Sequence, residues 1–289
     1  MSVITQRLQT KDRDIGFTVR RALPAATLRS LGPFVFLDHM GPERFAVGTT
    51  EGDVRPHPHI GLATVTYLFS GAMMHRDSLG TVARIEPGAV NWMTAGSGIV
   101  HSERVPEDVR TGNHQVEGMQ MWVALPRELE ETAPGFWHYA AEDLPYVEGP
   151  GSRVHVLCGQ FGGKTSPVKA PSPTSFLAVE LSAQGSITLP ADYEERGIYI
   201  VCGTVNIEGE QIDEHELVTF AAGEPVTITA LDEVRLMVVG GAPLDGPRFL
   251  WWNFVSSDRD KVLAAQERWK DQKFAPVPGE TEFIPLPER

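Results

Sequence analysis

Two pairs of possible metal ligands stand near each other in the first half of the chain. The stretch RPHPHIGLATVTY, which begins at Arg55, contains His57 and His59 one residue apart. The later stretch TAGSGIVHSE ends with His101 and Glu103, again one residue apart. Residues i and i+2 of a β-strand point to the same face. Two neighbouring strands would therefore direct three imidazoles and one carboxylate to one point.

Such a set of side chains predicts a metal site. Three neutral nitrogens and one anionic oxygen suit a divalent transition metal. No cysteine stands among the candidates, which makes a closed structural zinc site the weaker interpretation. Four protein ligands on an octahedral ion would leave two positions for water, oxygen or substrate. The alternative, four unrelated polar residues, is not excluded by spacing alone.

We interpret the other histidines as structural or exposed residues. His75, in MMHRDSLG, follows a glycine turn, and we expect it to hydrogen-bond Asp77. The remaining five stand alone in the sequence: His39, His114, His138, His155 and His215.

Short apolar segments predict an all-β fold. They are rich in β-branched and aromatic residues, end at Gly or Pro, and indicate a sandwich or barrel. Examples are TVTYLFSG, MQMWVALP, SRVHVLCGQ, GIYIVCGTVNIEG and DEVRLMVVGG. One helix is expected in SSDRDKVLAAQERWKDQKF, on the outside of the sheets, with Ser256 and Ser257 as candidate caps.

The chain also repeats itself weakly. TYLFSG, ending at Gly71, is similar to IYIVCG, ending at Gly203, and VNWMTAG is followed in the same order by its counterpart LVTFAAG. We therefore predict two β domains, 1–145 and 146–289, with the boundary near EDLPYVEGPGSR and the helix in the second.

This repeat serves as a control for the metal interpretation. The four candidate ligands correspond, in this alignment, to Leu189, Ala191, Ile228 and Ala230. None of these side chains binds metals, so the scaffold does not require the histidines for folding.

Charge and composition exclude several classes of function. The formal net charge of −13 and the lack of a Lys/Arg run argue against direct nucleic-acid binding. The N-terminal residues carry charges where a signal peptide needs an apolar stretch, and no segment has the apolar length of a membrane span. Cys158 and Cys202 lack metal or redox spacing. These features predict a cytoplasmic protein without membrane attachment.

Several segments resemble those of the pirin family. They are FLDHMGP, RPHPHIGLATVTYLFSG, HRDSLG, PGAVNWMTAGSGIVHSE and GPRFLWWNFVSS. The resemblance covers nearly the whole chain and implies two tandem cupin β-barrels packed in a monomer. It implies one metal, usually iron as Fe(II), in the N-terminal barrel only. The family's ligand positions fall on His57, His59, His101 and Glu103.

The chain departs from the family pattern at one position. Many pirin relatives carry a Glu in a G-F-E-T setting after the histidine pair, whereas this chain reads GLAT with Ala63. If strand alternation continues through this stretch, Ala63 faces the same way as the histidines and enlarges the pocket. Glu103 is then the only carboxylate expected to act at the metal.

The resemblance implies two functions of different kinds. The first is a quercetinase-type dioxygenase that uses O₂ to open a flavonol-like aromatic enol, with Glu103 as a ligand or general base. Four apolar residues are candidates for holding its flat ring: Phe36, Trp92, Met93 and Met121. The second is a redox-responsive regulator, similar to a transcription cofactor, that binds a partner protein. A cupin that binds metal adventitiously is a third interpretation, and the complete ligand set argues against it.

Overall fold

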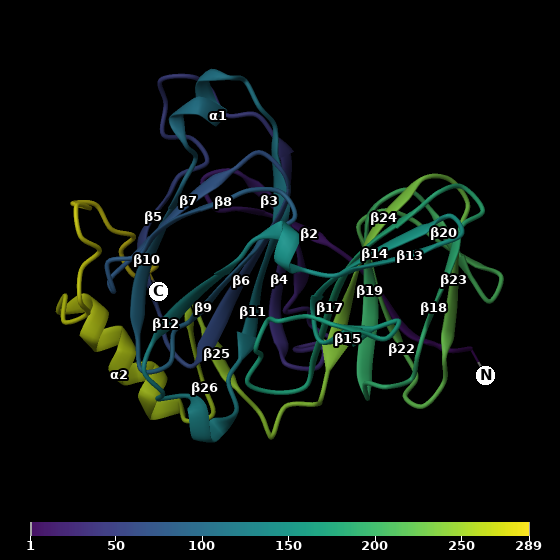
Figure 1. The fold of residues 1–289 in the computed structure, drawn as a ribbon. Coiled ribbons are helices and arrows are strands. Elements are labelled where there is room, and N and C mark those ends of the chain that lie inside the picture. Colours follow the sequence, from purple (N-terminus) through teal and green to yellow (C-terminus); the bar gives the residue numbers. More distant parts are fainter. Residues whose placement is uncertain (1, 289) are drawn as a thin grey trace. The chain divides into compact units, whose positions relative to one another are not determined.

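A computed structural model describes residues 2–288 and divides the chain into two compact units. Unit 1 comprises the chain up to Asp12, Arg20–Leu37 and Glu142–Pro243, and unit 2 comprises Arg13–Val19, Asp38–Ala141 and the chain from Leu244 onward. Strands dominate both units, as the sequence predicts (Figure 1). The helices of the described region are α1 (Glu107–Thr111), α2 (Arg259–Lys270) and the 3₁₀ turns Arg127–Leu129 and Ala141–Asp143.

Unit 2 is built on a four-stranded antiparallel sheet and most of a seven-stranded one. The larger sheet has the order β12 (Gly135–Tyr139), β9 (Val90–Thr94), β6 (Leu62–Ser70), β11 (Val116–Ala124), β4 (Phe34–Glu43), β3 (Thr18–Leu23) and β2 (Lys11–Asp14). The smaller has the order β5 (Val54–His59), β10 (Ile99–Arg104), β7 (Met73–Asp77) and β8 (Val82–Ile85). Leu68 of β6 and Ile85 of β8 share one apolar cluster, so the two sheets pack face to face.

Unit 1 repeats this plan. Its larger sheet has the order β1 (Ile4–Gln9), β22 (Glu216–Phe220), β19 (Glu195–Cys202), β24 (Val234–Gly241), β17 (Thr174–Leu181), β14 (Ser152–Cys158) and β13 (Tyr146–Gly149). The smaller has the order β18 (Ser186–Leu189), β23 (Val226–Ala230), β20 (Val205–Ile207) and β21 (Glu210–Ile212). Two hairpins complete the described strands: β15 (Gln160–Phe161) with β16 (Lys164–Thr165), and β25 (Phe249–Trp251) with β26 (Phe254–Ser256).

The predicted internal repeat is confirmed by these strand orders. TYLFSG lies on β6 and IYIVCG on β19, and these strands hold equivalent places in the two larger sheets. VNWMTAG and LVTFAAG begin on β9 and β22, which are equivalent as well. The order β5–β10–β7–β8 in unit 2 likewise matches β18–β23–β20–β21 in unit 1.

The two units do not divide the chain at a single point, because segments near both of its ends belong to the unit that is remote in sequence. The chain passes from unit 2 to unit 1 between Ala141 and Glu142, close to the expected boundary. The C-terminal helix, expected in the second domain, belongs instead to unit 2, because Val262 and Ala265 of α2 pack in one cluster with Ile60 of that unit. At the other end, β1 belongs to unit 1 because it pairs with β22.

Helix α2 begins one residue later than the serine caps that the sequence favours. The N-cap is Asp258, whose Oδ1 accepts a hydrogen bond from the Asp260 amide at 2.9 Å. An Asp cap contributes about 1 kcal/mol to helix stability. Ser256 does not cap the helix, because its hydroxyl donates a hydrogen bond to the Glu130 carboxylate at 2.7 Å.

No helix between residues 2 and 288 combines the length and apolar character that crossing a bilayer requires.

The C-terminal segment, residues 272–288, holds strand β10 from its outer face. The Ser102 hydroxyl and the Arg104 guanidinium donate to the Glu280 carboxylate at 2.8 and 2.6 Å. Ser102 and Arg104 alternate along the strand with His101 and Glu103, so they point to the opposite face. The segment therefore fixes a strand that carries two of the candidate ligands.

The same segment also reaches strand β5. The Ile284 amide donates to the Pro56 carbonyl at 2.8 Å, beside His57, and the Trp269 indole donates to the Ile284 carbonyl at 2.9 Å. Trp269 also packs edge-on against Phe274 at a centroid distance of 5.9 Å. Both strands of the candidate site are thus held by one segment that is remote in sequence.

We expect Glu280→Gln to destabilise the protein by about 1–2 kcal/mol, because it replaces a charge-assisted acceptor of Arg104 in a partly exposed pair. Denaturant unfolding near neutral pH measures this. Glu282→Gln is the matched control, since Glu282 bonds the same guanidinium at 2.9 Å but is 53% exposed, and it should have a smaller effect.

The effect of Glu280→Gln should also depend on pH. Hydrogen bonding from Arg104 lowers the pKa of Glu280 below its ordinary value of 4.5. A carboxyl with a depressed folded pKa contributes stability above its unfolded pKa and loses it as pH falls through the folded value. The two proteins should therefore converge in unfolding free energy under acid conditions. A difference that stays constant through this range would contradict the assignment.

Candidate metal centre

The pairing of β5 with β10 brings the two predicted pairs together. His57 lies directly opposite His101 in the antiparallel register, and His59 lies opposite Ile99. A bulge follows, so that Glu103 pairs with Val54. His57 and His59 share a face because one residue separates them, and the register places His101 beside that face.

Three of the four candidates form a compact cluster. One ring nitrogen from each of His57, His59 and His101 lies within 4.8 Å of the other two. The Nε2 atoms of His59 and His101 are 3.1 Å apart, and the ring centroids of His57 and His101 are 4.4 Å apart. All three side chains are buried.

Backbone carbonyls set the tautomers of two of these rings. His57 Nδ1 lies 2.9 Å from the Arg55 carbonyl oxygen, and His59 Nδ1 lies 3.1 Å from that of Asn253. A carbonyl only accepts, so each Nδ1 carries the proton and each Nε2 keeps a free electron pair. Asn253, in the turn of the β25–β26 hairpin, is a supporting residue that the histidine spacing did not reveal.

Burial keeps these imidazoles neutral. Desolvation lowers the pKa of His57 to about 4 and the pKa values of His59 and His101 well below the ordinary value. One ring nitrogen from each of three neutral, buried imidazoles, all within 4.8 Å of one another, can bind one cation together. The residues present therefore fit a divalent transition metal.

Glu103 is buried next to this cluster but is not part of it. Its carboxylate does not join the group of three nitrogens found within 4.8 Å among the described residues. Burial raises the pKa of Glu103 to about 7, against the lowering effect of a hydrogen bond with Thr66. A carboxyl with this pKa can exchange a proton near neutrality, and a nearby cation would favour its ionised form.

A second layer supports His101. His75 Nε2 lies 3.1 Å from Asp77 Oδ2, so the predicted His75–Asp77 hydrogen bond is confirmed. The ring of His75 stacks on Phe136 with centroids 4.4 Å apart, and its Nδ1 lies 3.4 Å from Nδ1 of His101. Burial would raise the pKa of Asp77, but hydrogen bonds from His75 and Thr81 outweigh it and lower that pKa.

Ala63 does not face the histidines, contrary to the expectation from simple alternation. Gly61 adopts a left-handed φ of +68° between β5 and β6, which breaks the alternation. On β6, Thr66 bonds Glu103 and so marks the face that looks toward the site. Ala63 precedes Thr66 by an odd number of residues and points to the other face. It therefore adds no space beside the metal ligands.

Of the apolar residues proposed to hold a ring, only Met93 lies on the site's face of the sheet. It pairs with Thr64, which shares its face with Thr66. Trp92 and Met121 both pair with Val65 and point the other way.

Phe36 lies in the first part of β4, which belongs to unit 1, and the Arg21 guanidinium lies 4.4 Å from its ring centroid. The aromatic residues that do border the site are Trp122, whose ring centroid is 5.2 Å from that of His59, and Phe136. Trp122 pairs with Thr64 of β6 and so lies on the site's face, a register that the sequence alone did not give.

Unit 1 shows the same scaffold without a site. In its smaller sheet Ile228 pairs with Ile187, and Val226 pairs with Leu189. This register makes Ile187 and Leu189 equivalent to His57 and His59, two residues before the positions that the sequence alignment gave. All of these side chains are aliphatic and belong to the core of unit 1.

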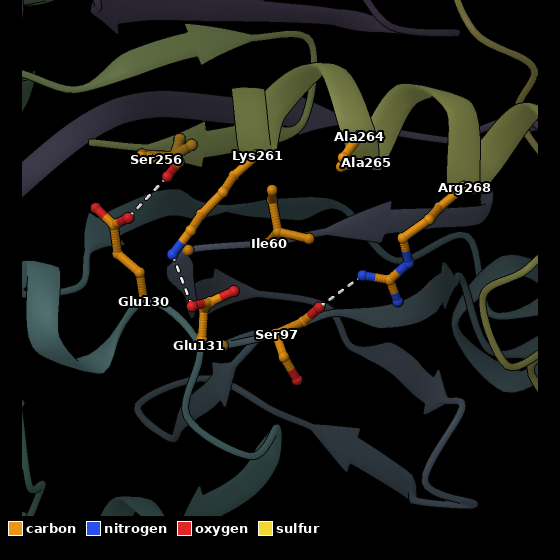
Figure 2. Close-up of a pocket in the computed structure, with 12 residues that line it drawn as sticks. Ile60, Ser97, Glu130, Glu131, Ser256, Lys261, Ala264, Ala265 and Arg268 are labelled. Carbon is orange, nitrogen blue, oxygen red and sulfur yellow. Dashed lines mark hydrogen bonds and ion pairs between the residues drawn. The ribbon is translucent and has the colours of Figure 1, made fainter. Parts of the chain in front are cut away.

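A cavity of about 110 Å³ lies between α2 and the end of β5, and no histidine lines it (Figure 2). Its charged groups are bonded to neighbours: Lys261 to Glu131 at 2.7 Å, and Arg268 to the Ser97 carbonyl at 3.0 Å. Figure 2 shows these side chains bridging the helix and the loops below it. We interpret this cavity as a gap left by helix packing.

Comparison with known proteins found matches in both halves of the chain. The Pirin family model matches residues 16–123, and the Pirin C-terminal cupin domain model matches residues 176–275. A pirin-like protein of Caulobacter vibrioides is 47% identical over 280 residues, covering 96% of both chains.

Two solved structures named quercetin 2,3-dioxygenase, both from Acinetobacter baumannii, superpose closely. The first has a TM-score of 0.90 at 34% identity and covers 98% of this chain and 95% of its own. The second has a TM-score of 0.88 at 25% identity and covers 96% and 99%. The two units are thus tandem cupin barrels, as the sequence predicted, and the chain belongs to the pirin family.

Proposed function

We propose that this protein is a metal-dependent dioxygenase of the quercetinase type, which uses O₂ to open a flavonol-like aromatic enol. The observation that carries the proposal is the convergence of three buried, neutral imidazole nitrogens beside a buried carboxyl group. The likeness to structures named quercetin 2,3-dioxygenase supports the substrate class. A small aromatic substrate and O₂ are then the partners of the site.

The proposed ligands are His57, His59, His101 and Glu103, and the proposed metal is Fe(II). Such an ion, when bound, supplies Lewis acidity that lowers the pKa of a substrate hydroxyl. The three histidines would hold it through Nε2, because their Nδ1 atoms face other partners. Glu103 completes the set, and its carboxylate is also the base proposed to take the proton of the substrate hydroxyl.

The aromatic and apolar residues around the cluster would orient the substrate. Trp122 contacts His59, Phe136 covers His75, and Met93 lies on the same face of the larger sheet. Flat apolar side chains can hold a flat ring and exclude water from the reacting atoms. Of the residues that sequence alone suggested, this set keeps Met93.

Burial of the site favours a second candidate function. His59 and His101 are 1% exposed, His57 7% and Glu103 8%, so a substrate would need a local opening. A closed site suits a redox-responsive regulator, similar to a transcription cofactor, in which the metal signals its state to a partner protein. The net charge of −13 would then select a basic patch on that partner. For either function we propose a cytoplasmic monomer that binds neither nucleic acid nor membrane.

Oxygen uptake on adding quercetin tests the enzymatic proposal. We expect uptake in proportion to measured iron content, and its loss to background in His101→Ala, because that variant lacks one of three nitrogen ligands. His114→Ala is the matched control, since His114 is exposed and lies outside the cluster. Iron-replete protein that consumes no oxygen would overturn the proposal.

Glu103→Gln tests the role of the carboxylate. It preserves the shape of the side chain but removes its basicity, so we expect turnover to fall by about 100-fold or more. Metal content should persist because three histidines remain. Glu103→Asp, which keeps a carboxylate, should retain more activity. Unchanged turnover in Glu103→Gln would exclude the base role.

Affinity capture with oxidised and reduced protein tests the regulatory alternative. A redox-responsive regulator should recover a partner in one state and lose it in the other. His101→Ala, which removes the metal, should abolish this difference. Equal recovery of the same proteins in both states would contradict redox control.

A further inference from the structure

We propose that Asp77 and His75 form a hydrogen-bonded chain that sets the tautomer of His101 and thereby decides which nitrogen His101 presents to the metal. Both are positioning residues, because neither belongs to the cluster of three nitrogens. The inference rests on the proposed metal site and goes beyond it by assigning a task to the HRDSLG segment.

The strand pairing creates this chain. In the register of β7 with β10, Asp77 lies opposite His101 and His75 lies opposite Glu103. An H-x-D pair thus stands beside an H-x-E pair on the neighbouring strand, and all four side chains lie on one face. The diagonal contact brings Nδ1 of His75 to 3.4 Å from Nδ1 of His101.

Asp77 is the fixed end of this hydrogen-bonded chain of side chains. It is fully buried, and its Oδ1 accepts hydrogen bonds from the amides of Leu79 and Thr81 at 2.9 and 3.0 Å. Its Oδ2 lies 3.1 Å from Nε2 of His75. The carboxylate therefore cannot rotate without breaking two turn hydrogen bonds, and it offers His75 only an acceptor.

The proton positions follow from this acceptor. A neutral His75 carries its proton on Nε2, facing Asp77, and its Nδ1 is then an acceptor. His101 can satisfy that acceptor only by carrying its own proton on Nδ1. The Nε2 electron pair of His101 is then free and points to Nε2 of His59, 3.1 Å away. Stacking on Phe136 holds the His75 ring in this orientation.

His101 thus differs from the other two histidines. A backbone carbonyl fixes the Nδ1 proton of His57 and of His59, and mutation cannot alter such a group directly. Two side chains fix that of His101, so this tautomer can be reversed by substitution.

Asp77→Asn is the decisive variant. The Asn oxygen should keep the amides of Leu79 and Thr81, so its NH₂ group would face Nε2 of His75. His75 would then carry its proton on Nδ1, facing His101, and His101 would move its proton to Nε2. We expect Co²⁺ affinity to fall about 10- to 100-fold, the usual range for residues that orient metal ligands.

The histidine ring nitrogens of the metal-free protein report the tautomers directly. Nitrogen-15 NMR should show a bare Nε2 on His101 in the wild type and a protonated Nε2 in Asp77→Asn. His75→Gln, with Asp77 unchanged, should keep the wild-type pattern, because its amide can donate to Asp77 and accept from His101. His75→Leu leaves Nδ1 of His101 without this partner but presents no donor to it. We therefore expect this variant to lose Co²⁺ affinity without a reversed tautomer.

Wild-type protein with a proton on His101 Nε2, or Asp77→Asn with unchanged tautomer and Co²⁺ affinity, would overturn the proposal. Failure of the proposed function looks different. In that case, wild-type protein would bind one Co²⁺ with the expected tautomers but, loaded with iron, leave quercetin unreacted. This result would contradict the dioxygenase proposal and leave the hydrogen-bonded chain of Asp77, His75 and His101 unaffected.

Discussion

The candidate site depends on one constraint, the burial of three neutral imidazoles with one ring nitrogen of each within 4.8 Å of the other two. Strand pairing imposes it, because the register of β5 with β10 sets His57 opposite His101 and brings His59 Nε2 to 3.1 Å from His101 Nε2. With the tautomers proposed above, buried acceptors would face each other there without a donor unless a cation lay among them. The surrounding structure is arranged to hold it.

Strand β10 is held on both faces, and β5 is held by backbone groups. On the inner face, carbonyl oxygens and the His75–Asp77 pair fix the imidazole rings. On the outer face, Glu280 of the C-terminal segment bonds residues that alternate with the ligands. The barrel scaffold does not need the histidines in order to fold, because aliphatic residues occupy the equivalent strand positions in unit 1. The site is present in one copy of a repeated barrel and absent from the equivalent strands of the other.

Sequence reasoning reached the fold and the histidine cluster because both depend on local pattern. Alternation within β-strands and the repeat of TYLFSG in IYIVCG contain the necessary information. It failed where the contact is remote or the backbone irregular. The left-handed Gly61 reversed the direction expected for Ala63. The placement of α2 in unit 2 and the support of His59 by the Asn253 carbonyl depend on contacts far apart in sequence.

Anomalous diffraction at the absorption edge of the metal, on crystals of protein purified with its own metal, tests the central claim most directly. The account predicts a single site per chain, with Nε2 of His57, His59 and His101 each at about 2 Å from the ion. A metal bound elsewhere, coordination through Nδ1, or a metal-saturated crystal with no ion at these histidines would contradict it.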